Sequence, residues 1–513
     1  MKITELIKNR ARKFLGIENG AQRMYESDLE NLRTYQAMEN RVYYIGDSNK
    51  IRWFYTKSQW AGVIANNPLY NMNRRNYFST IVANEQAKMV HSGLPRAIVD
   101  TLCAVMGMPT VSVEGIDSEE LDRLRKETKV DRIIYKQQMP LTLAEGWGAL
   151  KVNMSTKYKK YPTLEFYEAK DVDFIVRDGV TVGIIYRDYY SAKNRDYVLM
   201  ETRRLDGEGN SLIEYELFEM RATNLIPVPL DTVPELANLE NVKIGYDRIL
   251  GIPCRLVYDP DNPDYGQSLY AGRIDLFDDL DQSLSVRSQT CKVSPPIEYV
   301  PVEFIKRGKD GQSGLPHVYN RQMVDIPAIA DGDGNINARI TTSQPTLNFE
   351  QYTAEEIALT NQILIGLLSP ATMGIDLSRR DNAEAQREKE KVTEMTRNNL
   401  IVPQGDIIRE TYALLLDAKD IMDGRKPREW KIDVAYSQFA SPSFEGKAKA
   451  LVPLFNSEAI SDEMFVDKLY GDQLSREQKE EEVARIREKR STDKNGILDD
   501  LMEQDKNPDE DRI

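Results

Sequence analysis

The stretch LLSPATMGIDLSRRDNAEAQREKEKVTEMTRNNL, from Leu367 to Leu400, determines how the second half of this chain is interpreted. Ser369 and Pro370 end a helical pattern, because the residue before a proline is disfavoured in a helix. Gly374 gives conformational freedom to the backbone that follows it. A polar run then follows, formed by Ser378, Arg379, Arg380, Asp381 and Asn382. Either of its last two residues can cap a new helix that begins AEAQREKEK. A polar loop of this length between two helices is more often functional than idle.

Two helices are predicted before this loop, each with residues at the three- and four-residue spacing of a buried face. The later helix carries Ala354, Ile357, Ala358, Asn361, Leu364, Ile365 and Leu368 in this spacing. The earlier one carries Leu269, Leu276, Phe277, Leu280 and Leu284, and it ends by Pro295 and Pro296. Its acidic residues Asp275, Asp278, Asp279 and Asp281 fall largely on other sides, so we interpret them as an exposed acidic face. Between the helices, residues 295–345 read as short strands and glycine-rich turns.

The rest of the chain alternates between helical and strand patterns. Residues up to about Lys136 are predicted to be mostly helical, and short strands are predicted from Trp147 to about Tyr258. The sequence Arg177, Asp178, Gly179 within that region is typical of a hairpin. After the polar loop a helical pattern runs toward Met422, where Val402 and Pro403 predict a kink or an end. A strand at REWKIDVAYSQF and a small helical C-terminal unit follow.

Composition limits the classes of function. The 513 residues include 68 Lys and Arg against 82 Asp and Glu, a formal net charge of −14. Clamping DNA by neutralising its phosphates needs clustered cations, so a DNA partner of this acidic protein is expected to slide past. Cys103, Cys254 and Cys291 are sparse and form no disulfide framework. The basic amphipathic N-terminal segment lacks the apolar stretch of a signal peptide, and no run of residues is apolar enough for a membrane span.

Motifs for catalysis are nearly absent from the sequence. It contains no G-x-x-x-x-G-K-[ST] phosphate loop. His91 and His317, the two histidines, have no cysteine or acid at metal-ligand spacing, and we interpret both as structural. The run from Asp331 to Asn335 resembles the start of a calcium loop, but Ile336 stands where glycine is needed, so a hairpin turn is the better interpretation. The acidic cluster on the earlier helix lacks a second segment with ligands. No catalytic residue, cofactor or metal site is predicted.

The order of these blocks resembles portal proteins of tailed bacteriophages, especially the long-tailed phages of Gram-positive hosts. The segment SPATMGI, the polar loop and NAEAQREKEKVTEMTRNNL resemble the family's tunnel-loop region. Further blocks agree in order: ENRVYYIGD, HSGLPRAIVDTLCAVMGMP, GQSLYAGRIDLFDDLDQSLS, SPSFEGKAKALVPLF and EAISDEMFVDKLYGDQLSREQKEEE. These blocks span nearly the whole chain, and their order and spacing together are more specific than any one alone.

The resemblance implies an α+β fold with a β-containing wing and long helices, an inserted α/β clip between two stem helices, and a helical C-terminal crown. The implied regions are 1–262 for the N-terminal region and wing, 263–294 for the first stem helix, 295–345 for the clip, 346–368 for the second stem helix, 369–382 for the tunnel loop, 383–442 for the tunnel helix and return to the wing, and 443–513 for the crown and a flexible tail.

The resemblance also implies a non-enzymatic function, a ring channel at the head vertex for DNA packaging and ejection. The ring usually has twelve subunits, and it is assembled in the host cytoplasm and carried in the virion. Implied partners are double-stranded DNA, the terminase large subunit, a head-tail adaptor, and the major capsid and scaffolding proteins, with no membrane. The tunnel loop would contact DNA through Arg379 and Arg380. The clip would dock partners through Val302, Phe304, Ile305, Lys306 and Arg307. The alternative, which stays open, is that the apolar residues among them pack against the neighbouring clip.

Two alternatives from other classes stay open at this point. One is an acidic nucleic-acid-processing enzyme, such as a metal-dependent nuclease with dispersed carboxylates. The other is a head-tail adaptor or scaffolding protein, which the length of the chain and the loop between two helices disfavour.

Overall fold

The computed structural model describes residues 20–57, 89–154, 160–221, 224–293, 297–301, 322–326, 340–343, 349–375, 383–437, 451–455, 457, 460–470 and 478–488. It divides the chain into two compact units, Met1–Ser437 and Gln438–Ile513. Helices and strands are mixed in the first unit, so the fold is α+β, as the sequence predicts.

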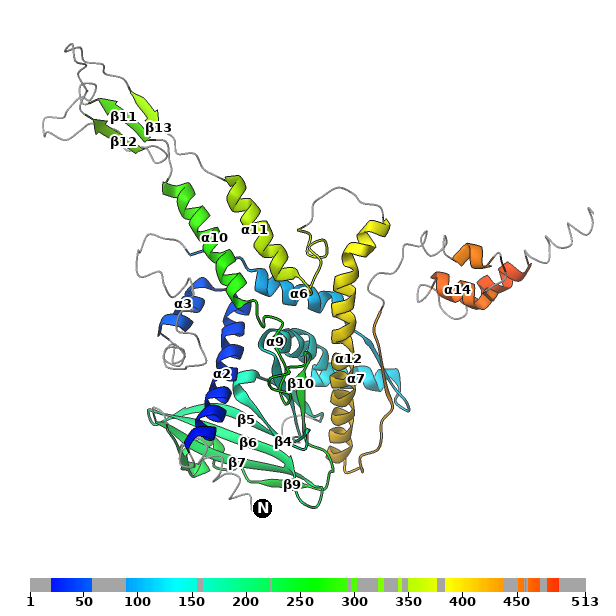
Figure 1. The fold of residues 1–513 in the computed structure, drawn as a ribbon. Coiled ribbons are helices and arrows are strands. Elements are labelled where there is room, and N and C mark those ends of the chain that lie inside the picture. Colours follow the sequence, from blue (N-terminus) through cyan, green and yellow to red (C-terminus); the bar gives the residue numbers. More distant parts are fainter. Residues whose placement is uncertain are drawn as a thin grey trace, which may run out of the picture. The chain divides into compact units, whose positions relative to one another are not determined.

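The first unit contains long and short helices (Figure 1). They are α2 (Gly20–Ile45), α3 (Ser48–Lys57), α6 (Leu94–Met106), α7 (Ser118–Thr128), α8 (Val130–Ile133), the π-helical turn η1 (Ile134–Gln138), α9 (Met139–Glu145), α10 (Ile274–Val293), α11 (Phe349–Leu364) and α12 (Ala383–Met422), with short 3-10 turns at Ala169–Asp171, Leu230–Thr232 and Pro234–Leu236. Among the described helices, none combines the length and apolar character that crossing a bilayer requires.

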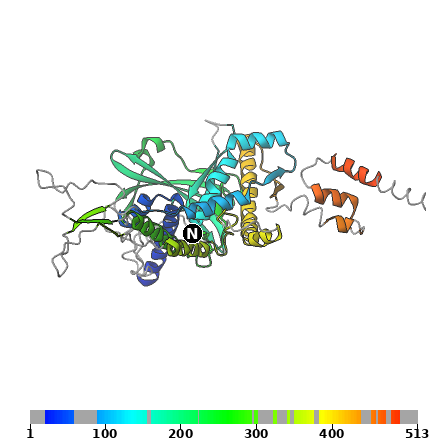
Figure 2. The ribbon, with the colours of Figure 1, turned by 90° about the horizontal axis from the view of Figure 1, so that it is seen from above.

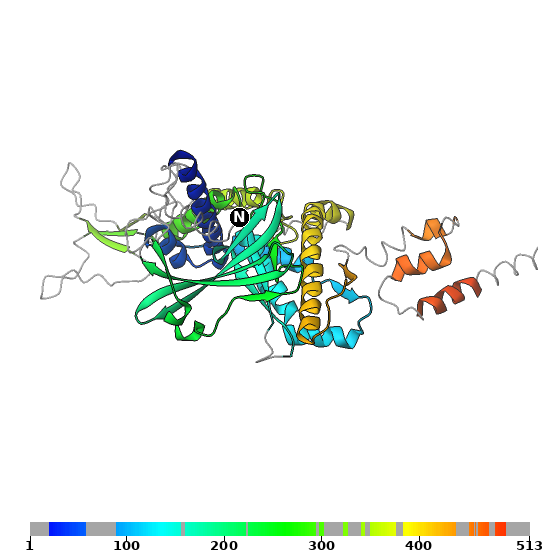
Figure 3. The ribbon, with the colours of Figure 1, turned by 90° about the horizontal axis from the view of Figure 1, so that it is seen from below.

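The described strands of the first unit form four sheets. The strands are β1 (Thr110–Val113), β2 (Trp147–Asn153), β3 (Thr163–Glu168), β4 (Val172–Arg177), β5 (Val180–Ala192), β6 (Arg195–Leu205), β7 (Ser211–Arg221), β8 (Asn224–Val228), β9 (Val242–Ile244), β10 (Gly251–Arg255), β11 (Ile297–Pro301), β12 (Gln322–Ile326), β13 (Thr341–Ser343) and β14 (Ile432–Ala435). The largest sheet has the order β4-β5-β6-β7-β8, with β9 also paired to β7, and Figure 3 shows its long strands side by side. The three-stranded sheets have the orders β10-β2-β3 and β12-β11-β13.

Two tight hairpins set the register of the largest sheet. The predicted turn at Asp178 and Gly179 is confirmed: Arg177 pairs with Val180, and both turn residues have positive φ, 51° and 76°. Such a turn matches the twist of the flanking strands. A second turn of this kind joins β5 to β6 at Lys193 and Asn194, with φ of 51° and 61°. The strand pattern alone did not predict it, although Asn at a turn is a recognised signal.

Several segments distant in sequence meet in the main core of the first unit. The core contains side chains from α6, α9, β2, β10, α10, α11 and α12, among them Leu102, Leu143, Leu150, Ile252, Phe277, Leu364 and Leu415. A second cluster joins α2 to the sheets through Ala37, Trp147, Phe174 and Tyr186. A third cluster, on the largest sheet, contains Tyr197, Leu217 and Leu236. The first unit is therefore held together by contacts between its two halves as well as by local hairpins.

The helix after the polar loop corrects one prediction. The sequence predicts a kink or an end at Pro403, and the end is wrong, because α12 is a single helix from Ala383 to Met422 with this proline inside it. Buried side chains on both sides of the proline, Leu400 and Ile407, hold the helix in the core. Tertiary packing therefore outweighs the loss of one backbone hydrogen bond.

The second unit has a small core of its own. The helix α14 (Asp462–Tyr470) contributes Phe465, Val466 and Leu469, which pack with Val483. Phe455 and Phe465 stack with ring centroids 4.1 Å apart. The helical C-terminal unit that the sequence predicts is thus present over its described residues.

Candidate functional site

The helices α10 and α11 form an antiparallel pair, and they lie side by side in both views (Figures 1 and 2). Arg287 Nη1 lies 2.6 Å from Glu356 Oε2 near one end of the pair. At the other end the guanidinium of Arg273 donates to the carbonyls of Ile363 and Ile365, each at 3.1 Å. Such C-terminal carbonyls lack partners within their own helix, so Arg273 caps α11 from outside. Polar contacts therefore fix the pair at both ends.

One face of α11 is uncovered in the single chain. The residues predicted to be a buried face are mostly exposed: Ala354, Ile357, Ala358, Asn361 and Ile365, which we name the α11 stripe. Ile357 is 55% exposed and Ile365 is 68% exposed. Within α11 the buried residues are Ile363 and Leu364, which face α10 and the core. The helix was predicted correctly, but the prediction that this face is buried is wrong for the single chain.

The acidic face predicted on α10 is only half present. Asp275 and Asp279 are exposed, as expected, but Asp278 is 8% exposed and Asp281 is completely buried. The prediction of one exposed face of four acids is therefore wrong. Asp278 and Asp281 lie four and seven residues after the buried Ile274, so they share the helix face that points into the protein.

The buried acid Asp281 anchors the chain that leads into α6. Its Oδ2 lies 2.6 Å from His91 Nδ1, and its Oδ1 accepts the backbone N–H of Ser92 at 2.7 Å. One turn further along α10, Ser285 Oγ accepts the backbone N–H of Val90 at 2.8 Å. His91 thus makes a structural contact, in keeping with its interpretation from the sequence. His317 lies outside the described residues.

The first half of the predicted polar loop is a turn that packs on α12. The backbone N–H of Ser369 donates to Thr393 Oγ1 at 2.9 Å, and the hydroxyls of Thr372 and Thr393 lie 2.9 Å apart. Gly374 is exposed at φ +70°, and the Ile375 N–H closes the turn onto the preceding backbone. The remaining residues predicted for the tunnel loop lie outside the described residues: Ser378, Arg379, Arg380, Asp381 and Asn382.

The inserted module between α10 and α11 contains a small mixed sheet. β11 pairs parallel with β12 and antiparallel with β13. Short strands in this segment were predicted from the sequence, and the described part confirms them. The residues predicted to dock partners, Val302, Phe304, Ile305, Lys306 and Arg307, lie outside the described residues, as does the calcium-like run at 331–335.

A buried charge cluster joins α2, α9 and β3, and the sequence did not point to it. The guanidinium of Arg41 is paired with Glu145 and lies 2.7 Å from Glu168 Oε1. The backbone N–H of Ala169 donates to Glu145 Oε2 at 2.9 Å. Burial raises the pKa of Glu145 to about 7, and the charge of Glu168 acts in the same direction while Arg41 opposes it. The cluster fixes α2 against the sheet.

A second buried network lies between β2, β3 and the largest sheet. Lys151 Nζ donates to the hydroxyl of Tyr167 at 2.6 Å and to Glu201 Oε2 at 3.2 Å. Arg203, which is 2% exposed, donates to Glu201 and to the carbonyl of Val152. Each cation is therefore paired. Across the described part of the chain, no three His, Cys, Asp or Glu side chains are grouped so that they could hold a metal ion.

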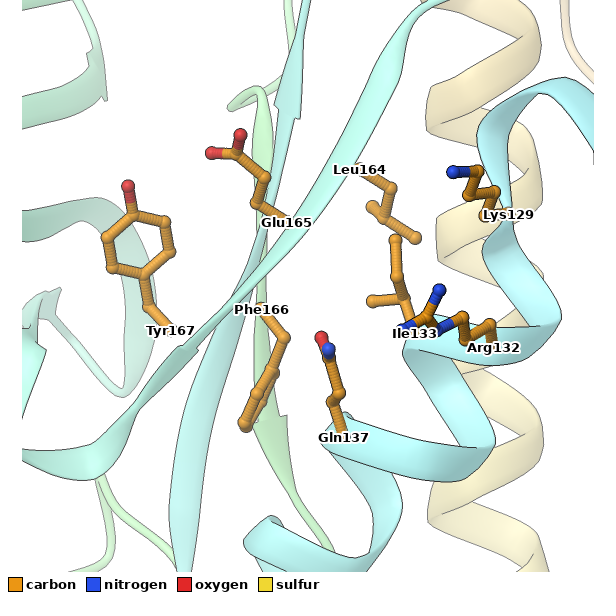
Figure 4. Close-up of a pocket in the computed structure, with 8 residues that line it drawn as sticks. All are labelled: Lys129, Arg132, Ile133, Gln137, Leu164, Glu165, Phe166 and Tyr167. Atoms are coloured by element: carbon orange, nitrogen blue, oxygen red, sulfur yellow. The ribbon is translucent and has the colours of Figure 1, made fainter.

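A shallow hollow of about 490 Å³ lies between a helical wall and β3 (Figure 4). The helical wall consists of Lys129, Arg132, Ile133 and Gln137, and the strand contributes Leu164, Glu165, Phe166 and Tyr167. In Figure 4, Leu164 and Phe166 point toward the helical wall, while Glu165 and Tyr167 point to the other side of the strand. Sequence patterns gave no sign of this hollow, since its two walls come from separate segments.

Comparisons with known proteins give no family for this chain. No model of a known family matches the sequence, and no curated protein matches it. The function is therefore inferred from the residues and from their arrangement.

Proposed function

We propose that this chain is the subunit of a portal ring, the channel at one vertex of a tailed-phage head through which double-stranded DNA enters and leaves. In this proposal residues 1–262 form the N-terminal region and wing, α10 and α11 the stem, 295–345 the clip and 369–382 the tunnel loop. Residues 383–442 form the tunnel helix and the return to the wing, and 443–513 form the crown and the C-terminal tail. The terminase large subunit, a head-tail adaptor, and the capsid and scaffolding proteins are its partners. No covalent step is assigned to the chain.

The α11 stripe is the observation that carries this proposal. The stripe has apolar residues at positions i, i+3, i+4 and i+11, with Asn361 at i+7, and covering apolar side chains of this kind would be favourable because it removes them from water. Here Ile357 and Ile365 are more than half exposed, while Ile363 and Leu364 are the buried residues of α11. A neighbouring subunit can cover this face, and a contact between two different surfaces of one protein closes into a ring when its rotation allows.

Exposed acids on α10 support the passage of DNA. Asp275 and Asp279 are one helical turn apart, and Glu355 of α11 lies near them. Partial burial and the negative charges of Asp275 and Glu355 raise the pKa of Asp279. If this acidic surface borders the channel of a ring, it repels phosphates over about 8–10 Å at physiological salt. Repulsion of this kind lets DNA slide.

The oligomer of the purified chain tests the proposal. We expect light scattering to give a mass of many subunits, and electron micrographs to show rings with a central hole. Replacing Ile357 and Ile365 by Glu places two charges in the stripe, so rings should disappear while the circular dichroism of the subunit stays as in the wild type.

The matched control is Gln351→Glu with Gln362→Glu, which adds the same two charges at exposed positions toward the edge of the stripe. This control should keep its rings. A wild-type chain that stays monomeric over a wide range of concentration and salt, or that stops at a twofold dimer, would reject the ring. Metal-dependent DNA cleavage that a single acidic substitution abolishes would favour the nuclease alternative.

A further inference from the structure

The strand β3 (Thr163–Glu168) has one open edge. It is the last strand of the sheet with the order β10-β2-β3, and it pairs with β2 from Gly148↔Glu168 to Asn153↔Thr163. Within the described residues, no strand pairs with its other side. A strand edge of this kind presents backbone N–H and C=O groups to which an extended chain can bind.

The hollow runs along this strand. Four consecutive β3 residues line it, from Leu164 to Tyr167, so side chains from both faces of the strand border it. Consecutive strand residues point to opposite faces of the sheet. A hollow bordered by side chains from both faces therefore follows the edge of the strand. Four strand residues span about 13 Å. Ile133 and the half-buried Phe166 add an apolar surface.

The helical wall of the hollow gives it a charge preference. Lys129 and Arg132 are both exposed, and neither has an ion pair among the described residues, in a chain of net charge −14. Glu165 also lines the hollow, where Asn153 Nδ2 donates to its Oε2 at 3.1 Å. Two cations without an ion pair in the described part of the chain, against one carboxylate that already accepts a hydrogen bond, give the lining of the hollow a net positive charge.

We propose that the β3 edge binds an extended acidic segment of another protein, which adds a strand beside β3. Backbone hydrogen bonds to β3 would provide affinity. Carboxylates of the segment would pair with Lys129 and Arg132, and an apolar side chain would pack on Ile133 and Phe166. This site is separate from the α11 stripe, so it does not depend on ring formation and can be measured on subunits that do not form rings.

The probe is a fluorescein-labelled nine-residue peptide that alternates Glu and Val, and binding is measured by fluorescence anisotropy. We expect the wild-type chain to bind it, more weakly as salt rises. Replacing Lys129 and Arg132 by Glu should weaken binding about tenfold or more, since two partly exposed ion pairs are lost and repulsion is added. The matched control is Lys50→Glu with Arg52→Glu on α3, also exposed and without ion pairs among the described residues, and it should bind like the wild type.

Two further measurements separate strand addition from simple anion binding. The same peptide with all of its backbone nitrogens methylated lacks backbone donors and should not bind. Hydrogen exchange of the amides of β3 should slow when the Glu-Val peptide is bound. If charge reversal impairs folding, Lys129→Gln with Arg132→Gln should still weaken binding several-fold.

Three results would overturn the proposal. The first is a wild-type chain that fails to bind the Glu-Val peptide. The second is binding that charge reversal leaves unchanged, or that leaves β3 amide exchange unchanged. The third is a single-stranded thymidine oligonucleotide that binds more tightly than the peptide and loses its binding in the Lys129 and Arg132 variant, which would assign the hollow to nucleic acid.

Discussion

At the scale of single residues, Asp281 is the acid on which the position of α10 depends most. Replacing it by Ala removes the acceptor of both His91 Nδ1 and the Ser92 N–H, and leaves those donors buried. We expect this to destabilise the first unit by about 2–4 kcal/mol. The measurement is the thermal midpoint of unfolding, which should fall by several degrees.

Asp279→Ala is the control on the same helix. Asp279 is exposed, and its nearest charges are the like charges of Asp275 and Glu355, so its removal should change stability by no more than about 0.5 kcal/mol. Equal midpoints for Asp281→Ala and Asp279→Ala would contradict the anchoring role of Asp281.

Glu145 makes the stability of the first unit depend on pH. Its pKa is about 7 in the folded chain against an ordinary value of 4.5, because the carboxyl is buried. The folded state therefore holds the proton more tightly than the unfolded state. The stabilisation is complete below about pH 4.5 and is lost as the pH rises through 7. The side chain of the Glu145→Gln variant cannot ionise. Its thermal midpoint should therefore rise relative to that of the wild type as the pH increases from 5 to 8. A difference between the two chains that is constant with pH would contradict this assignment.

At the scale of elements, Pro403 weakens the middle of α12 without ending it. Proline has no N–H to donate to the carbonyl of Asn399, and its ring crowds the preceding turn. Pro403→Ala should therefore stabilise the first unit by about 1–2 kcal/mol, after allowing for the greater freedom of the unfolded chain. The check is a urea unfolding midpoint, with the exposed neighbour Val402→Ala as the comparison that changes little. A lower midpoint for Pro403→Ala would show that the proline suits the local backbone.

The predictions for elements succeeded where local spacing determines structure. The helices α10 and α11 and the hairpin at Asp178 and Gly179 follow from side-chain periodicity and turn chemistry, which act over a few residues. The pairing of β1 with β14, where Thr110 lies opposite Ala435, could not be predicted. Each of these strands has four residues, and their pairing depends on how the helices between them pack.

The predictions for the candidate site failed in two informative ways. Periodicity identified the α11 stripe as a face to be covered, but it does not say whether the cover comes from the same chain. Charge led to the expectation that Asp278 and Asp281 are exposed, but their position on the helix places them inside. The partners of Asp281 come from His91 and Ser92, far away in the sequence, and only the fold brings them together.

At the scale of the whole molecule, the proposed ring gives a purpose to features that one chain leaves unexplained. The α11 stripe is exposed in the single chain, and in the proposed ring a neighbouring subunit would cover it. Two hydrogen bonds to Thr393 hold the turn at 369–375, so the start of the polar loop is anchored to α12. A loop fixed at its base and repeated around a ring can present the same side chains many times to one passing partner.

Arg379 and Arg380 are the residues of that loop that we expect to touch DNA. Each exposed pair with a phosphate contributes little and is screened by salt, which suits a partner that must move. Replacing both by Ala should leave ring assembly intact and reduce the DNA packaged or retained in assembled heads. The amount is measured as nuclease-protected DNA per head.

The control for the loss of two positive charges is the variant with Lys50→Ala and Arg52→Ala on α3. Heads that contain this variant should package as much DNA as the wild type. The competing role for the two arginines is to order the loop by pairing with Asp376, Asp381 or Glu384. Under that role the double variant fails to assemble rings, because the loop loses its own ion pairs. Normal packaging and retention in intact rings would reject DNA contact, whereas intact rings with less DNA are the result that we expect if the arginines act on the passing DNA.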